Sequence, residues 1–361
     1  MFKFETISMA VPKKATALKS FSKSLDKMER GLSCPIVLAG LIVATSVLFA
    51  GNLFLTALAG NPELSGGLFT RGISQVSAQF PLNITPAGFT FAIWGAIYLL
   101  QIGWNLYSLS SLCRFTENGP VYLNPPVLGT SFFVYFNVST LAVSAWLFMW
   151  DRLLFFAAFV FLAIVAISLF MTVFSGASSL ARYRSELVDQ GRCLDVKILT
   201  VTMVNGVSMY ATWSVVATLI NFGIILVYKL QTPLSNELAS IICLSILGLF
   251  VLLYTVLDAT ILRSFNRCNF TPFLTVIWAL IGVLANNLDF GNVSTIVSIV
   301  LLVGTSAIFL VKAVFSILPF ARVEQYEYRQ MKFARCVTPV LENKADNCCI
   351  TPALEKKAGN C

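Results

Sequence analysis

Eight long stretches of this sequence carry almost no charge, and they limit what the chain can fold into more than any other feature. A helix of about 20 apolar residues crosses the hydrocarbon core of a bilayer, and only helices or closed barrels satisfy their backbone hydrogen bonds there. The sequence therefore predicts an all-α polytopic membrane bundle of about eight transmembrane helices. The expected spans are residues 35–60, 88–110, 127–150, 153–176, 198–228, 239–262, 272–288 and 293–318, of which 272–288 is the shortest.

Composition indicates the same class and argues against catalysis. The 361 residues are 57% hydrophobic and 12% charged, with a mean hydropathy of +0.80, whereas soluble domains have about 25% charged residues. The sequence has no histidine, which is the commonest general base and metal ligand. Its nine cysteines show no metal-site spacing. We therefore expect a membrane protein that is not an enzyme and that has no metal site and no cofactor.

The basic residues are distributed unevenly between the segments that join the expected spans. If the N-terminus is cytoplasmic, 21 of the 25 lysines and arginines fall on the cytoplasmic side. Cytoplasmic loops of membrane proteins carry such an excess, so we expect both termini in the cytoplasm. The net charge of +8 then belongs to one membrane surface, where it would attract anionic lipids. It does not indicate a nucleic-acid partner.

The polar parts of the chain are its two terminal segments. In residues 1–33, apolar residues from Leu18 to Leu32 recur at helical spacing beside several lysines, which predicts a basic amphipathic helix on the cytoplasmic membrane surface. Acidic residues in this segment are unusual for a mitochondrial presequence, so we expect the plasma membrane or an endomembrane over a mitochondrial membrane. Residues 321–361 form a cytoplasmic tail with a 13-residue tandem repeat, 336–348 and 349–361, in which nine positions are identical.

The stretch from Asn83 to Asn105 is rich in aromatic residues. Thr85 is suited to capping a helix and Pro86 to its first turn. Trp94 and Tyr98 are four residues apart and should stack on one helix face. Such a wall is suited to binding a flat apolar molecule inside a membrane, although an aromatic belt at the membrane surface has the same composition.

A second informative stretch is the fifth expected span. It carries Tyr210, Trp213 and Asn221 on a helix with several other small or polar residues. Polar side chains in hydrocarbon face protein or a cavity, so this face either lines a site or packs against another helix. The third span carries Trp146 and Trp150, again four residues apart.

Together these motifs resemble the TspO/MBR (translocator protein / tryptophan-rich sensory protein) family. In that family a proline precedes a second-span tryptophan by eight residues and a tyrosine follows it by four, as Pro86, Trp94 and Tyr98 do here. The family's fifth span carries Tyr-x-x-Trp-x-x-x-Ala-Thr-x-x-Asn, which is kept here from Tyr210 to Asn221, with Met209 in place of a preceding proline.

The resemblance implies a TspO-like five-span region, residues 34–230, followed by three further spans, residues 231–320. It also implies that spans two, three and five form a pocket for a planar apolar small molecule of the porphyrin or sterol class. The residues implied in ligand binding are Trp94, Tyr98, Trp146, Tyr210, Trp213 and Asn221. Sensing or transport of the ligand, and assembly into an oligomer in the lipid bilayer, are compatible with this interpretation.

Two other functions stay open from the residues alone. An ion- or proton-coupled small-molecule transporter would use Asp258, which lies inside a span, together with Asn286 and Asn287. Lys312 lies at a depth comparable to that of Asp258, so the two charges either pair or reach separately to the membrane surface. A structural or scaffolding membrane protein would instead recruit partners through the 321–361 tail.

Overall fold

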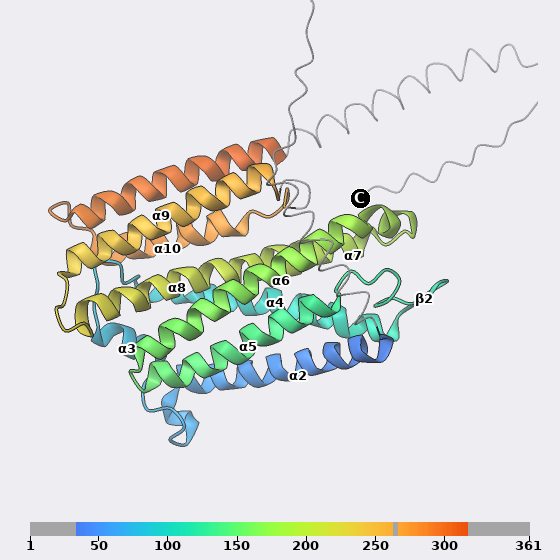
Figure 1. Ribbon diagram of the computed structural model, residues 1–361, viewed down its shortest axis with the longest axis horizontal. Coiled ribbons are helices and arrows are strands. Elements are labelled where there is room, and N and C mark those ends of the chain that lie inside the picture. Colours follow the sequence, from blue (N-terminus) through green and yellow to red (C-terminus); the bar gives the residue numbers. More distant parts are fainter. Residues whose placement is uncertain (1–33, 263–265, 317–361) are drawn as a thin grey trace, which may run out of the picture.

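The computed structural model describes residues 34–262 and 266–316, which are almost entirely helical (Figure 1). The long helices are α2 (Pro35–Gly60), α4 (Ile93–Cys113), α5 (Thr130–Asp151), α6 (Phe155–Asp189), α8 (Gly206–Tyr228), α9 (Asn236–Thr260) and Val293–Ser316, called helix 293–316 below. The shorter ones are η1 (Pro62–Ser65), α3 (Ile73–Gln79), η2 (Gly88–Ala92), α7 (Cys193–Ile198), the π-helical η3 (Leu199–Asn205) and α10 (Thr271–Asn287). A two-residue ladder pairs β1 (Phe115–Thr116) with β2 (Gly119–Pro120).

Seven helices in the described part of the chain are long and apolar enough to cross a membrane. They are the seven long helices, with η2 continuous with α4, and with α7 and η3 continuous with α8. The eighth expected span, α10, is apolar but has only 17 residues. The prediction of an all-α polytopic bundle is confirmed. The basic amphipathic segment and the tail repeat lie outside the described residues.

Two helix ends differ from the bounds of the uncharged stretches. Helix α6 continues past the fourth expected span, residues 153–176, to Asp189, because Ala177, Leu180 and Leu187 are buried at helical spacing beyond that span. Thr85 does not cap the second span. Its hydroxyl accepts a hydrogen bond from the Leu82 amide instead, and the helical segment begins with the 3₁₀ turn of η2 after Ala87.

Helix α8 lies between two groups of helices (Figure 1). On one side it packs against α4 and α6, and α6 in turn packs along α5, which packs along α2. On the other side it contacts α9 and α10. The large apolar side chains on the outer faces of the long helices, such as Val47, Ile167 and Val300, are exposed, as expected for contact with lipid.

The seven long helices and α10 alternate in direction along the chain (Figure 1). Helix α2 begins, and helix 293–316 ends, at the same end (Figure 1), which we call the Cys34 end. The opposite end carries η1 and α3 within the loop between α2 and α4, and we call it the Arg71 end. The described chain therefore enters and leaves the bundle on one side, because α10 adds one passage through the bundle to those of the seven long helices.

Candidate functional site

A cavity of about 210 Å³ lies near the Arg71 end between α2, α4 and α5. Helix α3 contributes Ile73 and Ser74 to its lining, so this short helix covers the end of the cavity. Ten residues from these elements line it: Thr56, Gly60, Ile73, Ser74, Phe91, Trp94, Tyr98, Val143, Trp146 and Leu147. Three of them are residues that the sequence predicted as ligand-binding.

One wall of the cavity is the stacked pair Trp94 and Tyr98. Their ring centroids are 5.5 Å apart and the ring planes are inclined by 25°, which confirms the stacking expected from their spacing. The Tyr98 hydroxyl donates a hydrogen bond to Thr56 Oγ1 of α2, at 3.3 Å. The phenol therefore joins α4 to α2, and the two rings present a flat apolar surface.

Tyr210 and Trp213 pack edge-on against Trp94 and are not among the residues that line the cavity. Their ring centroids lie 5.8 and 6.4 Å from that of Trp94, with ring planes nearly perpendicular to it. Both side chains are buried in α8. Neither is among the residues that line this cavity, and the expectation that both contact the ligand stays a prediction. Their structural effect is to fix the orientation of Trp94.

Asn221 lies apart from the cavity, about two helical turns beyond Trp213. It is fully buried, and neither atom of its amide has a hydrogen-bond partner within the described segments. Sequence periodicity placed Asn221 and Trp213 on nearly the same helix face. The structure places neither of them in the lining of the cavity.

Two polar atoms beside the cavity also lack a partner in the part of the chain that the structure describes. They are the indole Nε1 of Trp146, which lines the cavity, and the hydroxyl of Tyr210, which lies behind Trp94. An unpaired buried donor is costly. The Trp146 indole N–H is therefore a buried donor without a partner on a residue that lines the cavity.

The loop at the Arg71 end is held over the cavity by Asp151. This buried carboxylate accepts hydrogen bonds from the backbone amides of Thr70 and Arg71, at 2.7 and 2.8 Å, and from the Thr70 hydroxyl. The adjacent Trp150 indole donates to the carbonyl of Ile73, at 3.2 Å. Sequence reasoning missed this role of Asp151, because its partners are about 80 residues away and no local spacing indicates them.

Helix α10 holds the segment that leads into α4, where Phe91 and Trp94 of the cavity wall begin. The Ala87 amide donates to the Gly282 carbonyl and the Trp278 indole donates to the Thr90 carbonyl, both at 2.9 Å. Since Phe91 and Trp94 follow directly, these bonds determine where that side of the cavity lies. The position of the aromatic wall thus depends on a helix from the last third of the chain.

The residues grouped for an ion-coupled transporter do not form one site. Asn286 and Asn287 both donate to the Thr85 carbonyl at the Arg71 end. Asp258 lies near the Cys34 end, where Lys312 donates to both of its carboxylate oxygens at 2.8 Å. Asp258 and Lys312 therefore form an ion pair and do not reach separately to the membrane surface. Within the described residues, no group of three His, Cys, Asp or Glu side chains could hold a metal ion.

Comparison with known protein families gives a match over most of the described chain. The model of the TSPO-like protein family matches residues 41–315, which is more than half of the chain and extends through helix 293–316. No curated protein and no solved structure matches the chain.

Proposed function

The chain belongs to the TSPO-like protein family, and on that basis we propose that it binds a planar apolar small molecule at the cavity beside Trp94. The observation that carries this proposal is the pairing of a flat aromatic wall, Trp94 and Tyr98, with the unpartnered indole N–H of Trp146. A flat ring system would lie against the wall, and a ring nitrogen or oxygen would accept from Trp146. Binding is the first step for either sensing or transport of such a ligand.

The size of the cavity limits how a porphyrin- or sterol-class ligand binds. Pockets that enclose drug-sized ligands have volumes of about 300–1,000 Å³, whereas this cavity has about 210 Å³. Trp94 and Tyr98 are only partly buried, and Gly60 and Gly95 beside them are exposed. We therefore propose that one edge of the ring system enters the cavity and that the rest lies on the outer surface near these glycines, against lipid.

The test is a titration of the full-length protein in lipid nanodiscs with protoporphyrin IX. Absorption of the porphyrin and quenching of tryptophan fluorescence are followed together. We expect saturable binding, with a red-shifted porphyrin band and quenching that reach their plateau at the same ligand concentration. Linear, unsaturable partition equal to that of protein-free nanodiscs would contradict the proposal.

We also propose that the Cys34 end of the bundle faces the cytoplasm. The support is the charge distribution, since 21 of the 25 lysines and arginines belong to segments on that side of the expected spans. These basic segments would then contact anionic lipids of the inner membrane surface. The cavity beside Trp94 lies toward the opposite, outer side.

A further inference from the structure

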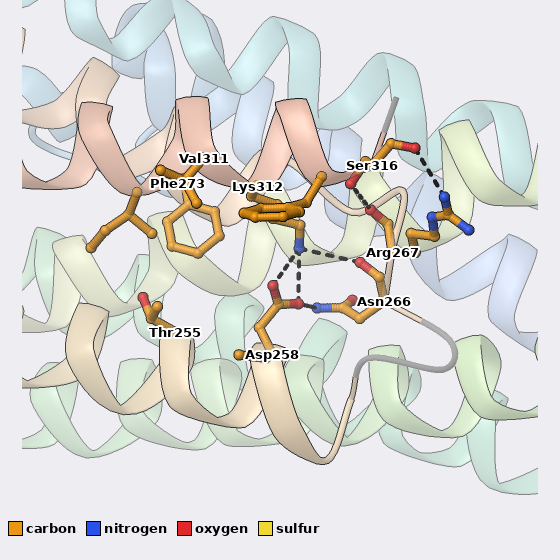
Figure 2. A pocket seen from close by; sticks show the side chains of 11 residues that line it. Thr255, Asp258, Asn266, Arg267, Phe273, Val311, Lys312 and Ser316 are labelled. Atoms are coloured by element: carbon orange, nitrogen blue, oxygen red, sulfur yellow. Dashed lines mark hydrogen bonds and ion pairs between the residues drawn. The ribbon is translucent and has the colours of Figure 1, made fainter. Parts of the chain in front are cut away.

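A larger cavity of about 730 Å³ lies near the Cys34 end, between α9, α10 and helix 293–316 (Figure 2). It shares no lining residue with the cavity beside Trp94. Its walls are mostly apolar, with Phe273 from α10 and Ile308, Val311 and Phe315 from helix 293–316. At its polar side the side chains of Asp258 and Lys312 point toward each other (Figure 2).

Every donor of Lys312 is already used. The ammonium donates to both carboxylate oxygens of Asp258, at 2.8 Å, and to the Asn266 carbonyl, at 3.2 Å, and an ammonium has three N–H groups. The Asn266 amide nitrogen likewise donates to the Tyr254 hydroxyl and to Asp258 Oδ1. Lys312 and the side-chain amide of Asn266 in this polar cluster therefore have no donor left to offer a ligand.

Acceptors remain free in the same cluster. Among the described residues, Asp258 Oδ2 accepts only from Lys312, while a carboxylate oxygen has two lone pairs. Thr255 donates its hydroxyl proton to the Val251 carbonyl, so its oxygen also keeps acceptor capacity. A group that binds to these acceptor atoms must therefore donate a hydrogen bond.

Charge narrows that group to a neutral one. The Lys312 ammonium lies 2.8 Å from both carboxylate oxygens of Asp258, so it would repel an ammonium head placed at this carboxylate. An anionic head would lie against the Asp258 carboxylate and find no free donor on Lys312. In low-dielectric surroundings such repulsions are large. A neutral hydroxyl fits the arrangement.

The cavity opens toward lipid. Ala259, Val311 and Phe315 line it and are also exposed on the outer surface of the bundle, so the mouth lies between α9 and helix 293–316. Both helices are among the candidate membrane spans. A molecule dissolved in the bilayer can therefore enter from the side, with its polar head directed to Asp258.

We propose that this cleft is a second binding site, for a neutral lipid-like molecule with a hydroxyl head. The hydroxyl donates to Asp258 Oδ2, and the apolar body lies along Phe273, Ile308 and Phe315. The ion pair with Lys312 keeps the carboxylate charged and oriented, and thus available as an acceptor. This site is independent of the function proposed for the cavity beside Trp94.

The experiment is photolabelling of the full-length protein in nanodiscs with hexadecanol that carries a diazirine in its chain. Labelled positions are mapped by mass spectrometry. Parallel probes with the same chain carry a methyl ether, a carboxylate or an amine in place of the hydroxyl. We expect the alcohol to label α9 and helix 293–316 about threefold to tenfold more than the methyl ether, the effect of one hydrogen bond, and more than either charged probe.

Two variants locate the site. Val311→Trp fills the mouth of the cleft and should abolish labelling by the alcohol. Val300→Trp is its control, since Val300 is an exposed valine three turns earlier on the same helix face and does not line the cleft. Equal labelling by the alcohol and the ether, stronger labelling by a charged probe, or equal labelling of the two variants would overturn the proposal. Trp94→Leu should leave labelling unchanged, which separates this site from the first.

Discussion

At the scale of single residues, the site is determined by what each aromatic side chain does with its polar atom. The Trp150 indole donates to the Ile73 carbonyl, whereas the Trp146 indole, one turn earlier on α5, has no partner in the described structure. Tyr98 joins two helices through Thr56. Two tryptophans that the sequence does not distinguish thus have different roles. Trp150 holds the loop through a hydrogen bond, and Trp146 lines the cavity.

This difference gives a paired prediction. Trp150→Phe removes a hydrogen bond and should lower the free energy of unfolding by about 1 kcal/mol, with little effect on porphyrin affinity. Trp146→Phe removes an unpaired donor, so stability should be unchanged or slightly higher while affinity falls about threefold to tenfold. Thermal unfolding and porphyrin titration of both variants check this. An affinity loss confined to Trp150→Phe would show that the roles are reversed.

At the scale of elements, the first turn of α4 depends on α10. Gly282 of α10 lies so close to Thr90 that a Cβ atom there would overlap the threonine side chain, and the Gly282 carbonyl accepts from Ala87. Phe89 packs edge-on against Trp278, with ring centroids 5.7 Å apart. Helix α10 therefore holds the aromatic wall in place.

Gly282→Ala should consequently push η2 away from α10. Overpacking of this kind costs about 1–3 kcal/mol, and the displaced wall should also weaken porphyrin binding. Gly304→Ala is the matched control, because no atom lies within 4 Å of the Cβ position there. Thr90→Ala in the Gly282→Ala background should restore part of both properties. If the two glycine variants unfold at the same temperature and bind equally, the contact does not position the wall.

The helices also show which features of the fold could be predicted from the sequence. The spans were predictable because uncharged stretches map directly onto membrane helices. The exact end of α6 was not, since Arg182 and Arg184 lie between the buried residues Leu180 and Leu187 in its last turns. The packing of Tyr210 and Trp213 against Trp94 was not predictable either, since it depends on how α8 lies against α4 and no local pattern shows that.

At the scale of the whole molecule, contacts between segments that are distant in the sequence decide where the cavity lies. The bonds from Asp151 to Thr70 and from Trp278 to Thr90 join residues separated by 81 and 188 positions. No local pattern signals such pairs. The family match over residues 41–315 covers all of these elements.

Orientation is tested by two variants that keep a single cysteine. One keeps the exposed Cys34, and the other has Leu288→Cys in the exposed turn after α10, at the Arg71 end. In sealed membrane vesicles with their cytoplasmic face outward, a membrane-impermeant maleimide should label Cys34 and should label Leu288→Cys only after permeabilisation. The reverse pattern would place the Cys34 end on the side away from the cytoplasm and contradict the proposed topology.

The central claim is that a planar ligand stacks on Trp94, and the most direct measurement compares two tryptophan variants of α4. Trp104 is fully buried against Phe132 and Phe136 and does not line the cavity. In protoporphyrin IX titrations followed by porphyrin absorption, Trp94→Leu should weaken affinity about tenfold, and Trp104→Leu should retain the affinity of the unmodified protein. Equal affinity of Trp94→Leu and the unmodified protein would contradict this account.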